Sequence, residues 1–286
     1  MYDLIFITTF IDHRCISDLL LSVLNFNSQL KLAVILVNQT EKLLNYKSNA
    51  IIHFYEIKSP LVGLSAARNL AINFILNEKL VAKYVMFPDD DTTFDHCFFM
   101  NFKNVVNSNT LIDVYCRNTR KMYKQLQLKE GQIVYDINKA MSVNMIIKFD
   151  IFQKVGFFDE AMGVGAYYGA GEDTDYFFRC YMNTGNGFYY TRKLWNYHPA
   201  SAVKYMDLSF KQLQKRYINY SRGVIYFYWK HKKPFGAVVC ICKGIVGMCV
   251  SLLSGNLKLS IARFYGVLSR MKTMRDLYRG ILHSSN

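Results

Sequence analysis

Short apolar runs alternate with stretches of helical periodicity through the first part of the chain. The runs are rich in β-branched residues and predict strands over 4–9, 32–37, 51–57 and 84–87. Apolar residues at helical spacing fill 16–26 and 64–76. Strands that are apolar on both faces are typical of a mostly parallel sheet with helices on both sides. The pattern therefore predicts an α/β fold of the nucleotide-binding type, whose ligands bind beyond the carboxyl ends of the strands.

The pattern changes near residue 204. From there onward the chain holds 15 Lys and Arg but only two acids, whereas the whole chain holds 35 and 21, so the net charge of +14 lies almost entirely in this last part. Cations and aromatic residues mix over 210–233, and 235–254 is apolar except for Lys243. The mixture returns after Leu257. We therefore predict one domain over 1–203 and a helical, basic and apolar region over 204–286.

Three interpretations compete for this C-terminal region. A spanning helix needs about 20 apolar residues, and a central Lys243 costs roughly 2.5 to 3.5 kcal/mol on insertion scales. Helices lying at the interface explain more, because each basic residue beside anionic lipid gains about 1 kcal/mol and a lysine can reach the headgroups. Nucleic-acid binding leaves the apolar stretch unexplained. The sequence favours peripheral attachment to an anionic membrane surface, and no nucleic-acid partner.

Composition excludes several classes of protein. With 51% apolar residues over 286 positions, the chain is neither a disordered tail nor a small stapled module. Its seven cysteines form no CxxC pair, which argues against a zinc site or a disulfide framework. Residues 1–10 lack the basic start and the cleavage site of a signal peptide. We expect a cytoplasmic protein.

Three adjacent carboxylates, Asp89, Asp90 and Asp91, follow the fourth predicted strand within Pro-Asp-Asp-Asp-Thr. Carboxylates that lie so close together repel one another unless a cation or strong hydrogen-bond donors offset their negative charge. Two acids separated by one residue suit an oxygen-preferring ion such as Mg²⁺ or Mn²⁺. The alternative is an acidic turn that caps a helix starting near Phe94.

A second acidic group, Gly-Glu-Asp-Thr-Asp, contains Glu172 and Asp173 and follows a glycine-rich loop. A carboxylate there is placed to act as a general base toward an incoming hydroxyl. The alternative is that these acids favour the helix start through its dipole. Tyr167, Tyr168 and Trp195 are candidate stacking faces for sugar rings.

Two cationic or titratable residues complete the candidate set. Arg68 lies one turn into the helix that opens Gly-Leu-Ser-Ala-Ala-Arg-Asn and offers a planar fork for phosphate, or else a surface salt bridge. His198, in Asn-Tyr-His-Pro after a short strand from Lys193, is a candidate for a metal or diphosphate contact, or for a hydrogen-bonded structural residue.

The order of these motifs resembles that of the family 2 glycosyltransferases with the GT-A fold, over roughly residues 2–200. The series runs from the Gly-x-x-x-x-Arg-Asn helix through Pro-Asp-Asp-Asp and Val-Gly-Phe-Phe-Asp-Glu to Gly-Glu-Asp-x-Asp and a late histidine. The resemblance implies that Asp89 and Asp91 bind Mn²⁺ or Mg²⁺, with His198 at the metal or the diphosphate. It implies that Asp173 is the catalytic base, with Glu172 as the second candidate.

The same resemblance assigns the donor contacts. Arg68 would contact the donor diphosphate, Asp90 would be a further residue of the donor site, and Thr8 and Thr9 would contact the nucleoside. Where the family commonly has an acid that reads the nucleobase, this chain has Asn38 and Gln39, and an amide can still hydrogen-bond a uracil edge because it both donates and accepts.

The implied activity is inverting, metal-dependent transfer of a hexose or N-acetylhexosamine from a nucleotide sugar, with UDP as the expected carrier. The acceptor would be a hydroxyl of a saccharide or lipid-linked saccharide, as in capsule or O-antigen biosynthesis. Such an enzyme would be attached peripherally to the inner face of the cell membrane. Two alternatives stay open from the sequence, a metal-dependent nucleotidyltransferase and a non-catalytic membrane adaptor.

Overall fold

The structure is a computed structural model that describes residues 1–106, 108–122, 126–200 and 207–282. The chain separates into two compact units. The first contains 1–62, 66–157 and 176–204, and the second contains 63–65, 158–175 and 205–286. Each unit is described by itself. The domain boundary expected near residue 204 lies outside the described residues and stays a prediction.

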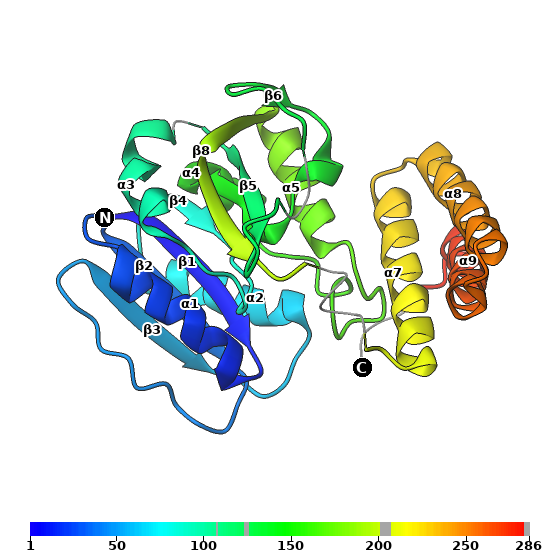
Figure 1. The fold of residues 1–286 in the computed structure, drawn as a ribbon, viewed down its shortest axis with the longest axis horizontal. Helices are drawn as coiled ribbons and strands as arrows, with labels where there is room; N and C mark the ends of the chain where they lie inside the picture. Colours follow the sequence, from blue (N-terminus) through cyan, green and yellow to red (C-terminus); the bar gives the residue numbers. More distant parts are fainter. Residues whose placement is uncertain (107, 123–125, 201–206, 283–286) are drawn as a thin grey trace. The chain divides into compact units, whose positions relative to one another are not determined.

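The first unit, as far as the chain is described, is built on an eight-stranded sheet of order β3-β2-β1-β4-β7-β5-β8-β6 (Figure 1). The strands are β1 Tyr2–Phe10, β2 Leu32–Asn38, β3 Ile52–Lys58, β4 Ala82–Met86, β5 Thr110–Cys116, β6 Ile133–Val134, β7 Met145–Lys148 and β8 Phe188–His198. β1 to β4 pair in parallel, which confirms the four predicted strands and their packing. β7 is antiparallel to both β4 and β5 and so joins the parallel half to the rest.

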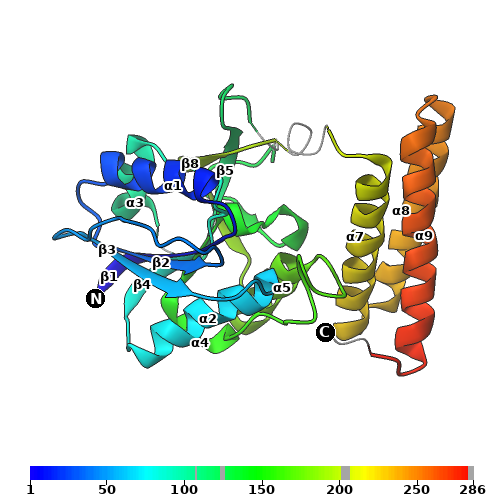
Figure 2. The ribbon, with the colours of Figure 1, turned by 90° about the horizontal axis from the view of Figure 1, so that it is seen from below.

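Helices cover both faces of this sheet. Figure 2 shows α1 His13–Phe26 and α3 His96–Val105 on one face, with α2 Leu64–Asn77 and α4 Phe149–Val155 on the other. α1 and α2 confirm the two helices predicted in this part of the chain. Leu19 and Leu20 of α1 and Phe98 of α3 join one buried cluster with Phe6 of β1 and Val34 of β2. The α/β fold thus follows from burying apolar strands under amphipathic helices.

Further short elements complete the path of the chain. The 3₁₀ turns η1 Ile137–Lys139 and η2 Ser142–Asn144 precede β7, and α5 Glu172–Thr184 precedes β8. α5 begins in the second unit and continues in the first. Glu172 and Asp173 lie in the first turn of this helix.

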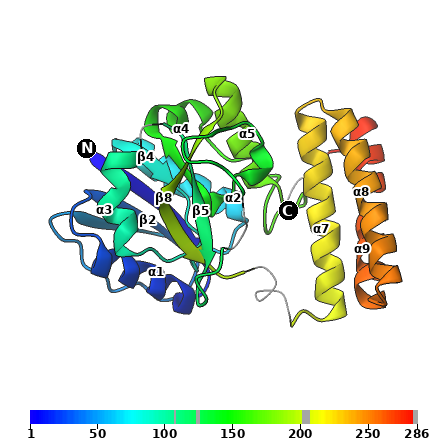
Figure 3. The ribbon, with the colours of Figure 1, turned by 45° about the horizontal axis from the view of Figure 1, so that its top comes forward.

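In the second unit, α7 Phe210–Lys230, α8 Pro234–Leu253 and α9 Leu257–Tyr278 lie side by side (Figure 3). Each start is defined by its sequence. Ser209 caps α7 by accepting a hydrogen bond from the Gln212 amide, Pro234 occupies the first turn of α8, and Asn256 caps α9. These bounds agree with the three helical segments predicted after residue 204.

α8 is long and apolar enough to cross a membrane, and it is the one such helix among the described residues. Only Ala237 and Ser251 of α8 are buried. A soluble core helix would be covered by its own chain. Exposed apolar surface of this kind is typical of a contact with a membrane or a partner protein.

The glycines of α8 allow two arginines of α9 to approach it closely. Arg270 donates a hydrogen bond of 2.6 Å to the Cys240 carbonyl, and a Cβ at Gly244 would lie 2.2 Å from its guanidinium. Arg263 donates to Ser251 at 2.7 Å and to the Gly247 carbonyl. These two cations are therefore used within the helical unit, where Gly244 and Gly247 leave space for them beside α8.

Candidate functional site

The three adjacent aspartates form a corner directly after β4. The Thr92 amide donates to the Asp89 carbonyl at 3.0 Å and closes the turn. Thr8, near the end of β1, donates its hydroxyl to the Pro88 carbonyl at 3.1 Å. The following helix, α3, is capped by Asp95, which accepts from the Phe98 amide at 3.1 Å. The alternative that the three aspartates cap this helix is therefore wrong.

His198 reaches this corner through strand pairing. It ends β8, and the preceding Tyr197 exchanges two backbone hydrogen bonds of 2.9 Å with Thr93, just after the aspartates. His198 Nε2 consequently lies 3.1 Å from Asp91 Oδ1 and 3.5 Å from Asp89 Oδ2. One ligand atom from each of Asp89, Asp91 and His198 lies within 4.8 Å of the other two. The structure thus brings together the three residues that the sequence proposed as metal ligands.

The electrostatics of the cluster are set by cations placed against its carboxylates. Burial lowers the pKa of His198, but hydrogen bonds with Asp89 and Asp91 outweigh it and raise that pKa to about 9. Burial raises the pKa of Asp89, but the hydrogen bond with His198 and the charge of Arg68 outweigh burial, so the pKa lies below its ordinary value. The Arg68 side chain is 4% exposed and lies 3.5 Å from Asp89 Oδ1. At neutral pH a protonated imidazole therefore sits between the two carboxylates.

This donor set fits a divalent metal. Two carboxylates and an imidazole suit Mn²⁺ or Mg²⁺, and the Asp89 side chain is 35% exposed and so is accessible from solvent. The proton held by His198 supplies the positive charge that a cation would replace. Arg68 lies beside Asp89 and is therefore placed to contact a phosphate that shares the metal.

Ser142 is a member of this site that the sequence did not single out. Its hydroxyl donates to Asp89 Oδ1 at 3.2 Å from the first position of η2. It lies in a stretch without a readable motif and 53 residues from its partner. Only the folded chain shows the contact, because nothing in the local pattern distinguishes this serine from any other.

The remaining donor candidates lie near the carboxyl ends of β1, β2 and β4. Asn38 is buried and holds its own loop, accepting from the Thr40 amide at 2.8 Å and donating to the Lys42 carbonyl at 2.6 Å. Gln39 accepts from the Val62 amide at 2.7 Å. Thr9 and Asp90 are half-buried. The nucleoside and diphosphate roles of these residues stay predictions.

In the second unit, the acids of the Gly-Glu-Asp-x-Asp motif divide into different environments. Asp175 is fully buried and accepts from Lys230 Nζ at 2.8 Å, with His231 Nε2 also at 2.8 Å. Glu172 is buried beside Gly163. Asp173 is half-exposed. The last acid of the motif is therefore structural, and Asp173 is the member of the pair with greater access to solvent.

The loop before this motif is fixed to α7. Lys230 Nζ also contacts Asp159 Oδ2 at 2.7 Å, and the Tyr168 ring stacks on Tyr226 at 4.0 Å between centroids. A Cβ at Gly223 would lie 2.0 Å from the Ala170 carbonyl oxygen, so the helix backbone touches the loop backbone. The segment 158–175 is thus held from α7 by charge, stacking and close backbone packing.

Two of the aromatic stacking candidates have other partners. Tyr168 is 1% exposed beneath Tyr226, so it offers no face to a sugar and that expectation is wrong. The Trp195 indole donates to Asp95 at 2.9 Å and so ties β8 to the cap of α3. Tyr167 lies under the guanidinium of Arg222, which is 4.4 Å from its ring centroid.

No protein-family model matches the chain, and no curated protein matches its sequence. Among solved structures, residues 1–349 of TarS from S. aureus are similar with a TM-score of 0.55 at 11% identity, covering 97% of this chain and 92% of that one. Their complex with UDP-GlcNAc gives a TM-score of 0.54 at 12% identity, with 98% and 92% covered. Mannosyltransferase PcManGT from Pyrobaculum calidifontis, with GDP-Man and Mn²⁺, gives 0.56 at 12% identity, with 96% and 88% covered.

These structural neighbours are glycosyltransferases with the GT-A fold. The resemblance inferred from the motif order is therefore confirmed in its fold, as is the α/β class. The neighbours bind nucleotide sugars, and the mannosyltransferase was solved with Mn²⁺. This chain has its own cluster of possible metal ligands in Asp89, Asp91 and His198.

Proposed function

We propose that this protein is an inverting, metal-dependent glycosyltransferase of family 2. It would transfer a hexose or N-acetylhexosamine from a nucleotide sugar, with UDP as carrier, to a hydroxyl of a saccharide or lipid-linked saccharide. The observation that carries the proposal is the cluster of Asp89, Asp91 and His198, with Arg68 beside it, on a GT-A sheet. A donor diphosphate needs such a combination of metal ligands and a cationic fork.

The residues of the first unit would hold the donor. Asp89, Asp91 and His198 would ligate Mn²⁺ or Mg²⁺, and Arg68 would bind a diphosphate oxygen. When bound, the cation acts as a Lewis acid that neutralises charge on the departing diphosphate. Ser142 and Arg68 both contact Asp89 Oδ1 and so would hold the carboxylate in place, which reduces the reorganisation needed when the donor binds.

Asp173 would remove the proton from the acceptor hydroxyl as that oxygen attacks the anomeric carbon opposite the leaving diphosphate. A single displacement of this kind inverts the configuration at that carbon. The half-exposed carboxylate of Asp173 supports this role over the buried Glu172, because a general base must reach a bound hydroxyl. Glu172 stays the second candidate.

The acceptor class and the location are supported by the second unit. The exposed apolar surface of α8 and the excess of basic residues after 204 favour peripheral attachment to the inner face of the cell membrane. An enzyme held there meets acceptors carried on lipid, as capsule or O-antigen precursors are. Lys243 is exposed within α8, which favours lying on the membrane over crossing it.

The test is metal-dependent release of UDP from a panel of UDP-sugars, with and without saccharide acceptors. A glycosyltransferase releases UDP, a nucleotidyltransferase releases pyrophosphate, and an adaptor releases neither. Asp91→Ala and Asp173→Asn should each abolish transfer while the protein stays folded. Proton NMR of the product should show the opposite anomeric configuration to that of the donor.

Glu78→Gln provides the matched control, because this exposed carboxylate lies just after α2, away from the metal ligands in the fold. Its rate should equal that of the wild type. Normal turnover by purified Asp91→Ala would remove the metal cluster from the mechanism, and normal turnover by Asp173→Asn would remove the proposed base.

A further inference from the structure

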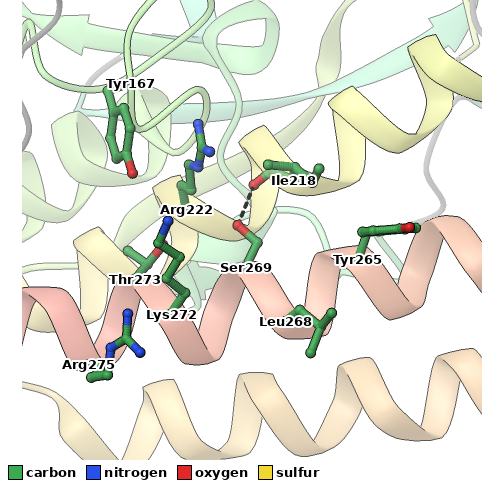
Figure 4. Close-up of a pocket in the computed structure, with 9 residues that line it drawn as sticks. All are labelled: Tyr167, Ile218, Arg222, Tyr265, Leu268, Ser269, Lys272, Thr273 and Arg275. Atoms are coloured by element: carbon green, nitrogen blue, oxygen red, sulfur yellow. Dashed lines mark hydrogen bonds between the residues drawn. The ribbon is translucent and has the colours of Figure 1, made fainter.

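The second unit contains a pocket of about 390 Å³ between α7, α9 and the loop that carries Tyr167 (Figure 4). Arg222 of α7 and Ser269 of α9 line it, and the Ser269 hydroxyl donates to the Ile218 carbonyl at 3.2 Å across the two helices. A volume of this size is in the range of small-ligand sites. The glycosyl-transfer proposal assigns no role to this pocket.

The pocket is strongly cationic at one end. Figure 4 shows Arg222 and Lys272 near Tyr167, with Arg275 further along α9. Arg275 is paired with Asp276 at 3.0 Å. Among the residues that the structure describes, neither Arg222 nor Lys272 forms an ion pair, and no acidic residue lines the pocket. An anion bound there would therefore meet two cations whose charge no carboxylate offsets.

The geometry of Arg222 suits a phosphate. Its guanidinium lies over the Tyr167 ring, 4.4 Å from the centroid, which holds the planar group in one orientation. A guanidinium held in this way binds phosphate oxygens through two parallel N–H donors, and a lysine adds a compact charge beside it. The hydroxyl of the buried Thr273 lies at the same end of the pocket.

The opposite end of the pocket is apolar and continues onto an exposed stripe. Tyr265 and Leu268 line this end, and both are exposed. Exposed apolar side chains recur along α9 three or four residues apart, so they share one face of the helix. They are Leu257, Ile261, Phe264, Leu268 and Met271.

We propose that this pocket binds the phosphate headgroup of one anionic lipid molecule, with Arg222 and Lys272 on the phosphate and the acyl chain along the apolar stripe of α9. A charged end joined to an exposed apolar face matches an amphipathic ligand, whereas a free phosphate would leave the apolar stripe exposed to water. This inference specifies how the protein would contact the membrane. It rests on the proposed function only in that the function places the protein at a membrane.

The test uses the full-length protein and dihexanoyl phosphatidic acid, a short-chain lipid that dissolves as a monomer. Isothermal titration calorimetry should give saturable binding of one molecule per chain. Arg222→Gln/Lys272→Gln removes both cations, and since each basic residue near an anionic lipid strengthens binding roughly fivefold, affinity should fall about 30-fold. Lys272→Glu changes one exposed residue and should weaken binding without endangering the fold.

The matched control is Lys215→Gln/Arg279→Gln, which removes one lysine and one arginine from exposed positions on α7 and just after α9, outside the pocket. It should bind the lipid as the wild type does. An equal loss in this control would mean general charge attraction and would overturn the proposal. Equal affinity for inorganic phosphate would overturn the lipid assignment, and so would equal affinity for dihexanoyl phosphatidylcholine.

Lipid binding is measured without donor, acceptor or metal. An inactive glycosyltransferase that still binds phosphatidic acid would refute the proposed function and support the pocket. An active one with no measurable lipid affinity would do the reverse. The two proposals can therefore fail separately.

Discussion

Lys230→Met is the substitution that most directly tests how α7 holds the acidic loop. The Lys230 ammonium lies 2.7 Å from Asp159 and 2.8 Å from Asp175, both of which belong to the segment 158–175. Methionine keeps most of the alkyl stem and removes only the charge. Asp175 would then keep His231, and Asp159 would keep the Tyr226 hydroxyl at 3.3 Å.

The magnitude follows from the burial of the partners. Leaving a buried carboxylate without its cation costs about 3 to 5 kcal/mol when the pair is fully enclosed. Asp175 is 0% exposed, but the side chains of Lys230 and Asp159 are 26% and 20% exposed, so water screens part of the effect. We therefore expect the free energy of unfolding to fall by about 2 to 3 kcal/mol, which moves a urea midpoint by about 1 M.

Tryptophan fluorescence gives a readout specific to the second unit. The chain has two tryptophans, and a Trp195→Phe background leaves Trp229, whose ring lies 5.6 Å from that of Tyr226. Urea unfolding is followed in this background for the parent and for Lys230→Met. Lys215→Met, at an exposed position of the same helix, is the matched control and should change stability by less than about 0.5 kcal/mol.

A double substitution separates charge from packing. Adding Asp159→Asn to Lys230→Met removes one of the two uncompensated carboxylates, so part of the lost stability should return. The reasoning is refuted if Lys230→Met is no more harmful than Lys215→Met. It is also refuted if Asp159→Asn adds its full cost on top of the first loss.

Two further predictions concern the metal cluster and the backbone contact of α7. The pKa of His198 is raised from 6.5 to about 9, so in the metal-free protein its ion pairs stabilise the fold fully below pH 6.5 and lose that contribution as the pH rises through about 9. Because a cation must displace this proton, Mg²⁺ binding at pH 7 should release about one proton. The affinity for Mg²⁺ should rise about tenfold for each unit of pH increase up to 9. In His198→Gln the affinity should not change with pH in this way. Calorimetry in buffers of different ionisation enthalpy measures the proton, and binding without proton release would contradict the geometry. Gly223→Ala places a Cβ 2.0 Å from the Ala170 carbonyl oxygen and should destabilise the second unit by about 1 to 3 kcal/mol in urea unfolding. Gly247→Ala meets only the flexible Arg263 side chain, at 3.3 Å, and should be neutral or stabilising by comparison.

The parallel half of the sheet could be predicted because its strands are buried on both faces. β2 is buried at every position, so it is a nearly continuous apolar run. Such a strand can be predicted from the local sequence, without knowledge of its partners in the sheet. β8 behaves differently, since polar and aromatic residues are mixed along it without a continuous apolar run. The sequence placed only its end, from Lys193, whereas the strand begins at Phe188. Its pairing with β5 and β6 depends on partners far away in the chain.

The order of the motifs predicted the proposed metal ligands, but it could not predict their geometry. His198 meets Asp91 only because Tyr197 pairs with Thr93 across the end of the sheet. The same limit applies to charge. Lys230 was counted among the basic residues of a membrane-facing helix, but it is paired with Asp159 and Asp175. Composition gives the net charge of a segment and not the partner of any one cation.

α7 belongs to the basic C-terminal region and also holds the segment 158–175. This changes how membrane attachment should be tested. Removing residues 204–286 would also remove Lys230 and Tyr226, which hold the segment 158–175 that contains Asp173. A truncated protein would then lose activity and lipid binding together, for two unrelated reasons. Polar substitutions at exposed positions of α8, such as Val246→Gln and Val250→Gln, leave α7 and its ion pairs intact. Loss of vesicle flotation in that variant, with UDP release unchanged, is the result that assigns attachment to α8 alone.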